Sequence, residues 1–125
     1  MTDQSILTTV KKGVGGIIEE DEAFDDEIIM HINSVLAKLT QFGIGPKSGF
    51  HISDKTATWG DFFGDNDCQN FIPSFVVLSV RLLFDPPTIG AVAQAMEKQR
   101  DEYEWRIREQ AEFEAGENER DEGGE

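Results

Sequence analysis

The sequence predicts an all-α protein: a small bundle of about four helices with a projecting loop and an acidic C-terminal tail. Three observations support this fold class. Apolar residues recur with the 3.6-residue period of a helix in two long segments, one in each half of the chain. A third long segment is apolar in every direction around a helical axis. The one stretch with strand-like alternation is short and rich in Gly, Asp, Ser and Thr.

The chain is long enough for one domain and is strongly acidic. It has 125 residues and a formal net charge of −14 at pH 7. From Glu97 to Glu125, twelve acidic and five basic residues leave a net charge of −7, half of the total. We therefore predict one helical domain at residues 1–113, with a loop insertion at residues 44–67. Residues 114–125 are predicted to form a polar, acidic tail that is disordered in isolation.

This charge disfavours several classes of partner. Affinity for nucleic acid comes mostly from Lys and Arg on phosphates, and anionic membranes attract basic segments, so an acidic surface suits neither. No apolar segment reaches the ~20 residues that span a bilayer, and no signal-peptide pattern opens the chain. The single cysteine, Cys68, excludes an intramolecular disulfide.

The first predicted helix is short. Ile6, Leu7 and Val10 form its apolar stripe, and Gly13 can end it. A helix of this length is marginal alone, so its stripe must pack on another element.

The second predicted helix has the clearest helical period of the chain. Its N-cap is expected at Asp25. Its apolar positions are Ile28, Ile29, Ile32, Val35, Leu36, Leu39 and Phe42. Gly43 should end the helix, with Ile44 reaching back to Leu39 in a Schellman motif.

Residues 44–67 predict a projecting β-hairpin followed by a short helical turn at "WGDFF". Phe50 and Ile52 alternate with polar residues, and an "SDKT" turn follows them. A solvated hairpin does not need so many large apolar side chains, which predicts that they form an interaction surface. The residues assigned to this surface are Phe50, Ile52, Trp59, Phe62 and Phe63.

A third long helix is predicted to start near Asn66 or Asp67 and to continue to Phe84. This helix is apolar on all sides, and a domain of about four helices has too few neighbours to cover it completely. We therefore expect another copy of the chain to bury part of it. Its Arg81 has two possible partners: Asp85, one turn on, or an acidic residue of a neighbouring copy.

A hard corner separates this helix from the last one. Pro86 and Pro87 cannot continue a helix, and Asp85 before them is pushed out of helical geometry. Thr88 is placed to cap the next helix. The corner is predicted to hold the last two helices at one defined angle.

The last helix is predicted from Ile89 to about Phe113. One face should hold it to its own domain, through Ile89, Val92, Met96, Tyr103 and Ile107. At 100° per residue, Trp105 falls about 200° from Tyr103, on the polar face. Its ring either lies on its own helix over Arg108 or Glu109, or anchors a partner.

Motifs for catalysis or cofactor binding are absent from the sequence. It contains no HExxH, paired CxxC, GxSxG or P-loop. A calcium-loop start at Asp65 fails, because the sixth and twelfth positions are Asn70 and Val76. The acidic residues 19–26 are interpreted as a solvated turn and helix start. We predict no catalytic residue, no metal site and no cofactor, and we do not expect an enzyme.

Three segments resemble a known family. They are "FDDEIIMHINSVLAKLTQFGIGP", the "TWGDFFGD" turn and "VRLLFDPPTIGAVAQAMEKQRDEYEWR". Together they are similar to the small head–tail connector proteins of tailed double-stranded DNA phages and prophages. The resemblance covers about Ile6 to Glu112, and its most specific part is the "RLLFDPP" corner followed by a helix that ends near "EWR".

The resemblance implies a helical structural protein that forms the first ring below the phage portal, about a dodecamer. It implies that the C-terminal helix binds the portal protein. The residues expected to do so are Trp105, Arg106, Arg108 and Phe113. It also implies that the next neck protein, the head-completion or stopper protein, binds the far side. Ring or neck contacts are expected at Arg81 and at the five loop residues named above.

The same resemblance implies that DNA passes through the lumen of the ring without specific binding. It places the protein in the virion, at the neck between head and tail, and in the host cytoplasm before assembly. Two other functions remain open from the residues: an acidic assembly chaperone that stays outside the virion, and an acidic DNA mimic that inhibits a DNA-binding enzyme.

Overall fold

The computed structural model describes residues 4–15, 17, 20–64 and 71–123, with side chains to residue 113. The helices in this part of the chain are α1 (Ile6–Gly13), α2 (Asp25–Gln41), α3 (Trp59–Phe63), α4 (Phe71–Phe84) and α5 (Gly90–Gly123). No strand occurs among the described residues, which contain only an isolated bridge between Ser5 and Thr58. The predicted all-α class is therefore confirmed. The predicted start of the third long helix lies outside the described residues.

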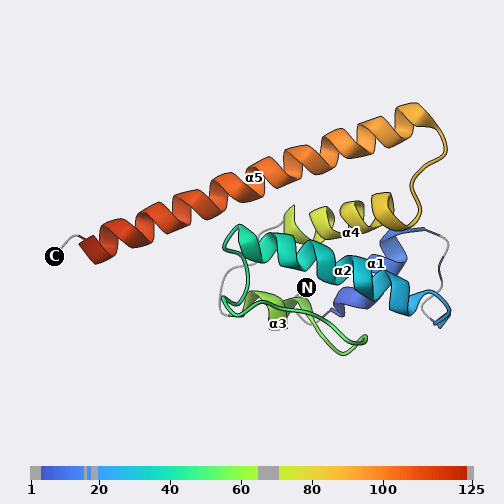
Figure 1. Ribbon diagram of the computed structural model, residues 1–125, viewed down its shortest axis with the longest axis horizontal. Coiled ribbons are helices and arrows are strands. Elements are labelled where there is room, and N and C mark those ends of the chain that lie inside the picture. The colour runs from blue at the N-terminus through green and yellow to red at the C-terminus, as the bar shows by residue number, and fades with distance from the viewer. Residues whose placement is uncertain (1–3, 16, 18–19, 65–70, 124–125) are drawn as a thin grey trace.

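Helix α4 is the element on which the others meet, because α1, α2 and α5 all contact it (Figure 1). Its buried apolar side chains are Ile72, Phe75, Val76 and Val80. Burying one such side chain contributes ~1.5–3 kcal/mol, so this helix provides much of the stability of the core. The opposite side of the core comes from the predicted stripes of α1 and α2, which are buried except that Ile29 and Phe42 are only partly so.

Helix α2 ends as the sequence predicts. Gly43 has a φ of 90°, the Gly43 N–H donates to the Thr40 carbonyl, and the Ile44 N–H donates to the Leu39 carbonyl. This is a Schellman motif. The predicted N-cap is wrong: Phe24 occupies the cap position and makes no side-chain cap bond, while Asp25 is the first helical residue.

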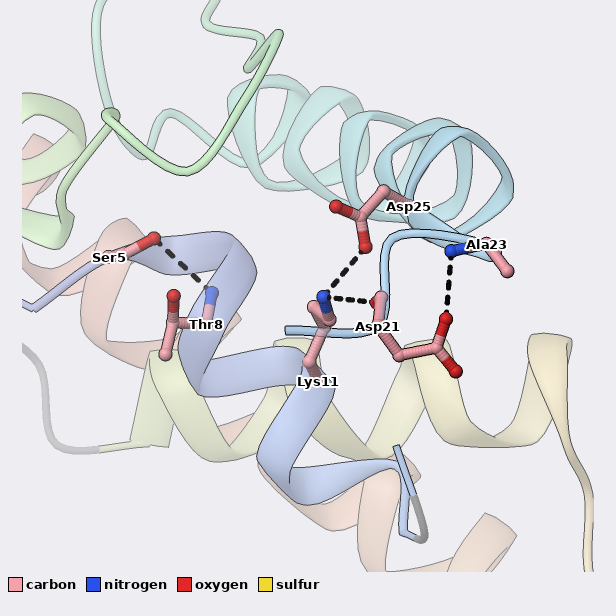
Figure 2. A network of polar contacts seen from close by, with 6 residues as sticks. All are labelled: Ser5, Thr8, Lys11, Asp21, Ala23 and Asp25. Atoms are coloured by element: carbon pink, nitrogen blue, oxygen red, sulfur yellow. Dashed lines mark hydrogen bonds and ion pairs between the residues drawn. The ribbon is translucent and has the colours of Figure 1, made fainter. Parts of the chain in front are cut away.

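The carboxylate of Asp25 instead binds a lysine of α1. Lys11 is only 3% exposed. Its Nζ lies 2.8 Å from Asp25 Oδ1 and donates a 2.7 Å hydrogen bond to the carbonyl of Asp21 (Figure 2). A buried ammonium is tolerated only when it is paired and hydrogen-bonded, as it is here. This contact attaches the linker and the start of α2 to α1.

The segment before α3 is a loop held by side chains, and the predicted hairpin is not confirmed. The Asn33 side chain in α2 accepts from the Ile52 N–H at 2.7 Å and donates to the Ile52 carbonyl at 3.0 Å. One amide thus satisfies both backbone groups that a partner strand would have paired. The predicted helical turn is confirmed as α3, with a capping box between Thr58 and Asp61.

An exposed aspartate at the tip of this loop has a shifted pKa. The pKa of Asp54 is lowered because its carboxylate accepts hydrogen bonds from the hydroxyl and the backbone N–H of Thr56. The Asp54 side chain is exposed, so this shift carries little weight for stability.

Helix α5 differs from the prediction at both ends. It continues to Gly123 and extends beyond the rest of the molecule, so the predicted end near Phe113 is too early (Figure 1). Glu, Ala, Gln and Arg are good helix formers, and such a segment can stay helical without packing. At the start, Ile89 and Val92 are 64% and 44% exposed, so they do not hold α5 to the domain as predicted.

The remaining members of the predicted inner face do approach the body. Met96 and Tyr103 are partly buried and Ile107 is fully buried. The first and the later residues of this face differ in burial because of the corner. Helix α4 ends at Phe84, and after the diproline turn the first residues of α5 have no α4 surface beside them to pack on. The apolar stripe therefore leaves an uncovered portion at the corner.

The Lys11 contact predicts a position-specific loss of stability. Lys11→Met removes the charge that pairs with a partly buried Asp25, and breaking a buried pair from one side costs ~3–5 kcal/mol. Because Asp25 keeps some exposure to water, we expect the lower part of that range. The exposed neighbour Lys12 gives a matched control, and Lys12→Met should change the free energy of unfolding by less than ~0.5 kcal/mol. Urea unfolding measures both variants, and equal stability for the two would contradict the assigned role.

The close approach of α1 to α4 at Gly13 gives a second prediction about stability. A Cβ at this position would lie 2.2 Å from Cγ1 of Val77, so α1 approaches α4 closely here. Gly13→Ala should destabilise the fold by ~1–3 kcal/mol through overpacking, despite the better helix propensity of Ala. Gly90 is the control, because a Cβ there meets nothing within 4 Å. Thermal unfolding should show Gly90→Ala at or above the wild type, and adding Val77→Ala should recover part of the loss in Gly13→Ala.

Candidate functional site

The described residues contain no cluster of metal-ligating side chains. Nowhere among them do three or more His, Cys, Asp or Glu side chains gather as a metal site would require. His31 lies 3.9 Å from Glu27 of its own helix and packs edge-on to the ring of Phe84. In the same part of the chain, none of the helices combines the length and the hydropathy needed to cross a membrane.

The loop residues predicted as an interface belong to the core. Ile52, Trp59, Phe62 and Phe63 are each at most 5% exposed. Phe50 is partly buried, with its ring 5.3 Å from that of Phe62. The expected exposed aromatic surface is therefore wrong, because these side chains fill the space between the loop, α1 and α2. Trp59 even donates from its indole N–H to the Thr9 hydroxyl at 3.2 Å.

The inner face of α5 is fixed to two other helices. The Tyr103 ring lies 5.6 Å from the ring of Phe71 in α4, and Ile107 has no exposed surface. Glu104 forms an ion pair with Lys38 of α2. Contacts to two separate helices restrain both the position and the rotation of α5 about its axis.

Two arginines predicted to bind a partner instead contact their own chain. The Arg106 guanidinium lies 5.5 Å from the centre of the Phe71 ring and pairs with Glu102 at 3.0 Å. The Arg108 guanidinium lies 5.3 Å from the centre of the Phe42 ring. These are cation–π distances. Both arginines thus lie at the edges of the inner face rather than at the centre of the outer one.

The outer face of α5 carries the exposed aromatic residues. Trp105 is 62% exposed and Phe113 is 63% exposed. The Trp105 ring does not lie under the Arg108 guanidinium, which is placed over Phe42. We call the surface formed by Trp105 and Phe113 the outer face of α5. Large exposed aromatic side chains on a restrained helix are typical of an interaction site.

Residues 6–114 match the profile of a family described as phage connector protein. This protein belongs to the phage connector family. The match covers most of the chain, and it confirms the resemblance drawn from the sequence motifs. No curated protein and no solved structure showed significant similarity to the chain. The family is structural, so the connector has its role in the phage particle and in contacts with portal or tail proteins.

The connector also has a groove that the sequence did not reveal. It has a volume of about 440 Å³ and lies between α1, α4 and α5. Its lining residues include Gly13, Val77, Leu78, Arg81, Met96 and Tyr103. The groove exists because the first turns of α5 lie apart from α4 at the corner, where Val92 is exposed, and α5 packs on α4 only further along, at Tyr103 (Figure 1). Periodicity along one helix cannot indicate such a separation. The sequence feature that could have indicated this groove was the excess apolar surface predicted for α4.

Arg81 lines this groove, and its side chain does not form the salt bridge with Asp85 that the sequence predicted as one alternative. Arg81 and Asp85 are joined only by a backbone hydrogen bond, from the Asp85 N–H to the Arg81 carbonyl at 2.9 Å. Among the described residues, the buried Nε of Arg81 has no hydrogen-bond partner. The intrachain salt bridge is therefore wrong, and an acidic residue from outside the chain stays a prediction.

Because Tyr103 and Trp105 lie on different faces of α5, their substitutions should have different effects on the stability of the fold. Tyr103→Ala removes the contact with Phe71 and should lower stability by ~2–3 kcal/mol, somewhat less than a fully buried aromatic residue. Trp105→Ala removes an exposed side chain and should change stability by less than ~0.5 kcal/mol. Thermal and urea unfolding of the two variants check this. Comparable losses in both would show that Trp105 packs on the domain and that the outer face is not free.

Proposed function

We propose that this connector forms the adaptor ring that joins the phage portal protein to the neck of the tail. The observation that carries the proposal is the division of α5 into two faces. The inner face is fixed on α2 and α4, while the outer face presents Trp105 and Phe113 to solvent. A helix held in this way is suited to bind a large partner without reordering, which lowers the cost of association.

The proposed portal-binding residues are Trp105, Arg106, Arg108 and Phe113, all of which are exposed on α5. Tryptophan and arginine are enriched among residues that dominate binding energy. The C-terminal part of α5 extends past the rest of the molecule, as Figure 1 shows. Trp105 and Phe113 are each more than half exposed, so a partner can reach both side chains.

The ring is proposed to contain about twelve copies around a central channel, a cyclic arrangement common to homo-oligomers. The next neck protein, a head-completion or stopper protein, binds on the far side. DNA passes through the channel without specific binding. The formal net charge of −14 per chain supports this part, because acidic walls repel phosphates.

The same charge bears on assembly. Many acidic copies in one ring repel one another, although salt screens exposed charges over ~8–10 Å. We propose that the free protein in the host cytoplasm is a monomer or a weak oligomer, and that the portal serves as the template on which the stable ring closes in the virion.

The experiment that tests the proposal is reconstitution with the portal of the same phage. Native mass spectrometry or sedimentation of the complex should show one connector chain for each portal chain or close to it. Purified virions should contain the connector in a similar number of copies. A protein that is absent from virions but needed for their assembly would be an assembly chaperone, and this outcome would overturn the adaptor proposal.

Trp105→Ala should weaken binding to the portal by at least about thirtyfold. Truncating a tryptophan at a desolvated interface costs ~2–4 kcal/mol, and each ~1.4 kcal/mol is a factor of ten in affinity. Ile89→Ala is the control, since Ile89 is equally exposed but lies just before the first residue of α5, about four turns away from Trp105. Titration at fixed salt measures both variants. If Trp105→Ala binds as tightly as Ile89→Ala, the outer face of α5 is not the portal-binding surface.

A further inference from the structure

The groove between α1, α4 and α5 has the chemistry of a site for an apolar side chain next to a carboxylate. Its lining combines Val77, Leu78 and Met96 with the guanidinium of Arg81. The Arg81 Nε is buried, and no acceptor among the described residues binds it. A buried donor without an acceptor is costly, and arginine is suited to bind a carboxylate with two parallel hydrogen bonds. A carboxylate from another chain is the acceptor that suits this donor best.

The outer face of α2 offers the complementary pair of side chains. Met30 is 59% exposed although it is a large apolar residue. Asp26 is exposed, lies one turn before Met30 and therefore projects from the same face of the helix. None of the ion pairs or hydrogen bonds found among the described side chains involves the Asp26 carboxylate, whereas the adjacent Glu27 lies beside His31. Methionine is flexible and fills irregular apolar spaces well.

We propose that the groove of one copy receives the outer face of α2 from a second copy, with Asp26 paired to Arg81 and Met30 inserted beside Val77 and Leu78. Charge complementarity selects this occupant: an unpaired cation lies in an apolar groove, and an unpaired carboxylate lies beside an exposed apolar side chain. The alternative occupant within the chain, the outer face of α5, carries the much bulkier Trp105 and is already assigned to the portal.

The two halves of this contact are different surfaces of the chain, since α2 does not line the groove. Such a contact is heterologous, and repeating it produces a closed ring when the rotation between copies permits, or an open filament when it does not. The inference thus rests on the proposed ring and names the contact that closes it. It also accounts for the excess apolar surface of α4, part of which lines the groove.

A charge exchange tests the contact without the portal. In Asp26→Arg the residue opposite Arg81 becomes basic, and in Arg81→Glu the residue opposite Asp26 becomes acidic. Each variant alone should weaken self-association by at least about tenfold, because like charges meet. An equimolar mixture restores both contacts, Arg with Glu and Asp with Arg, and should associate within about threefold of the wild type. Sedimentation velocity at low salt, from micromolar to about 1 mM protein, measures all four samples and reaches even weak complexes.

The controls separate this contact from general effects of charge and from folding. Glu27→Arg makes the same change in net charge one residue away, on a different part of the α2 surface, and should not weaken association. If Arg81→Glu melts below the wild type, Arg81→Gln replaces it. That variant should also weaken association, and Asp26→Arg should then add little further loss, because the pair is already broken.

Several results would overturn the inference. One is a wild-type protein that remains monomeric at 1 mM, and another is a mixture of the two charge variants that stays as weak as each alone. A loss of self-association in Trp105→Ala, with Asp26→Arg unaffected, would show instead that α5 of the second copy fills the groove. Because no portal is present in these samples, failure here leaves the adaptor proposal standing, and failure of portal binding leaves this contact standing.

Discussion

The burial of α4 between α1, α2 and α5 is the packing on which the rest of the structure depends. Three helices pack around it. Gly13 allows α1 to approach Val77 closely, and the Lys11–Asp25 ion pair then attaches the start of α2 to α1. The diproline corner follows directly from the end of α4. Because the helix is so apolar, it is stable only while its neighbours exclude water from it.

Function follows from the way α5 is carried by this core. Its middle turns are fixed through Tyr103, Glu104 and Ile107, so its outer face is presented in one orientation. Its first turns lie apart from α4 and leave a groove, and its last turns extend past the other helices (Figure 1). In the proposed adaptor ring, one helix provides a surface for a large partner and one wall of a site for a second copy. A structural protein that fits between two other assemblies needs both.

Local rules predicted much of this fold, and the failures have physical causes. Periodicity located the stripes of α1 and α2, and a glycine located the end of α2, because both depend only on neighbouring residues. The loop was misread because alternation at Phe50 and Ile52 suggested a strand, whereas Asn33, distant in sequence, satisfies the Ile52 backbone. Periodicity assigned Ile89 to the buried face, but its side chain is exposed. The apolar pattern of one helix does not show where the helix that would cover it ends.

The candidate site was predictable only in part for the same reason. Trp105 stood out because a tryptophan on a polar helical face has no place in the core, and the structure leaves it exposed. Arg106 and Arg108 were assigned to the partner, although their long side chains reach Phe71 and Phe42 on other helices. The groove at Arg81 arises from the angle between two helices, a property that no single segment of the sequence contains.

The most direct test of the central claim is a cryo-electron microscopy structure of the connector bound to the portal of its phage. The account predicts that Trp105 is buried against the portal while Tyr103 still packs on Phe71 of its own chain. Density showing Trp105 in solvent, or α5 detached from α4 and turned so that Tyr103 meets the portal, would contradict the division of this helix into an inner and an outer face.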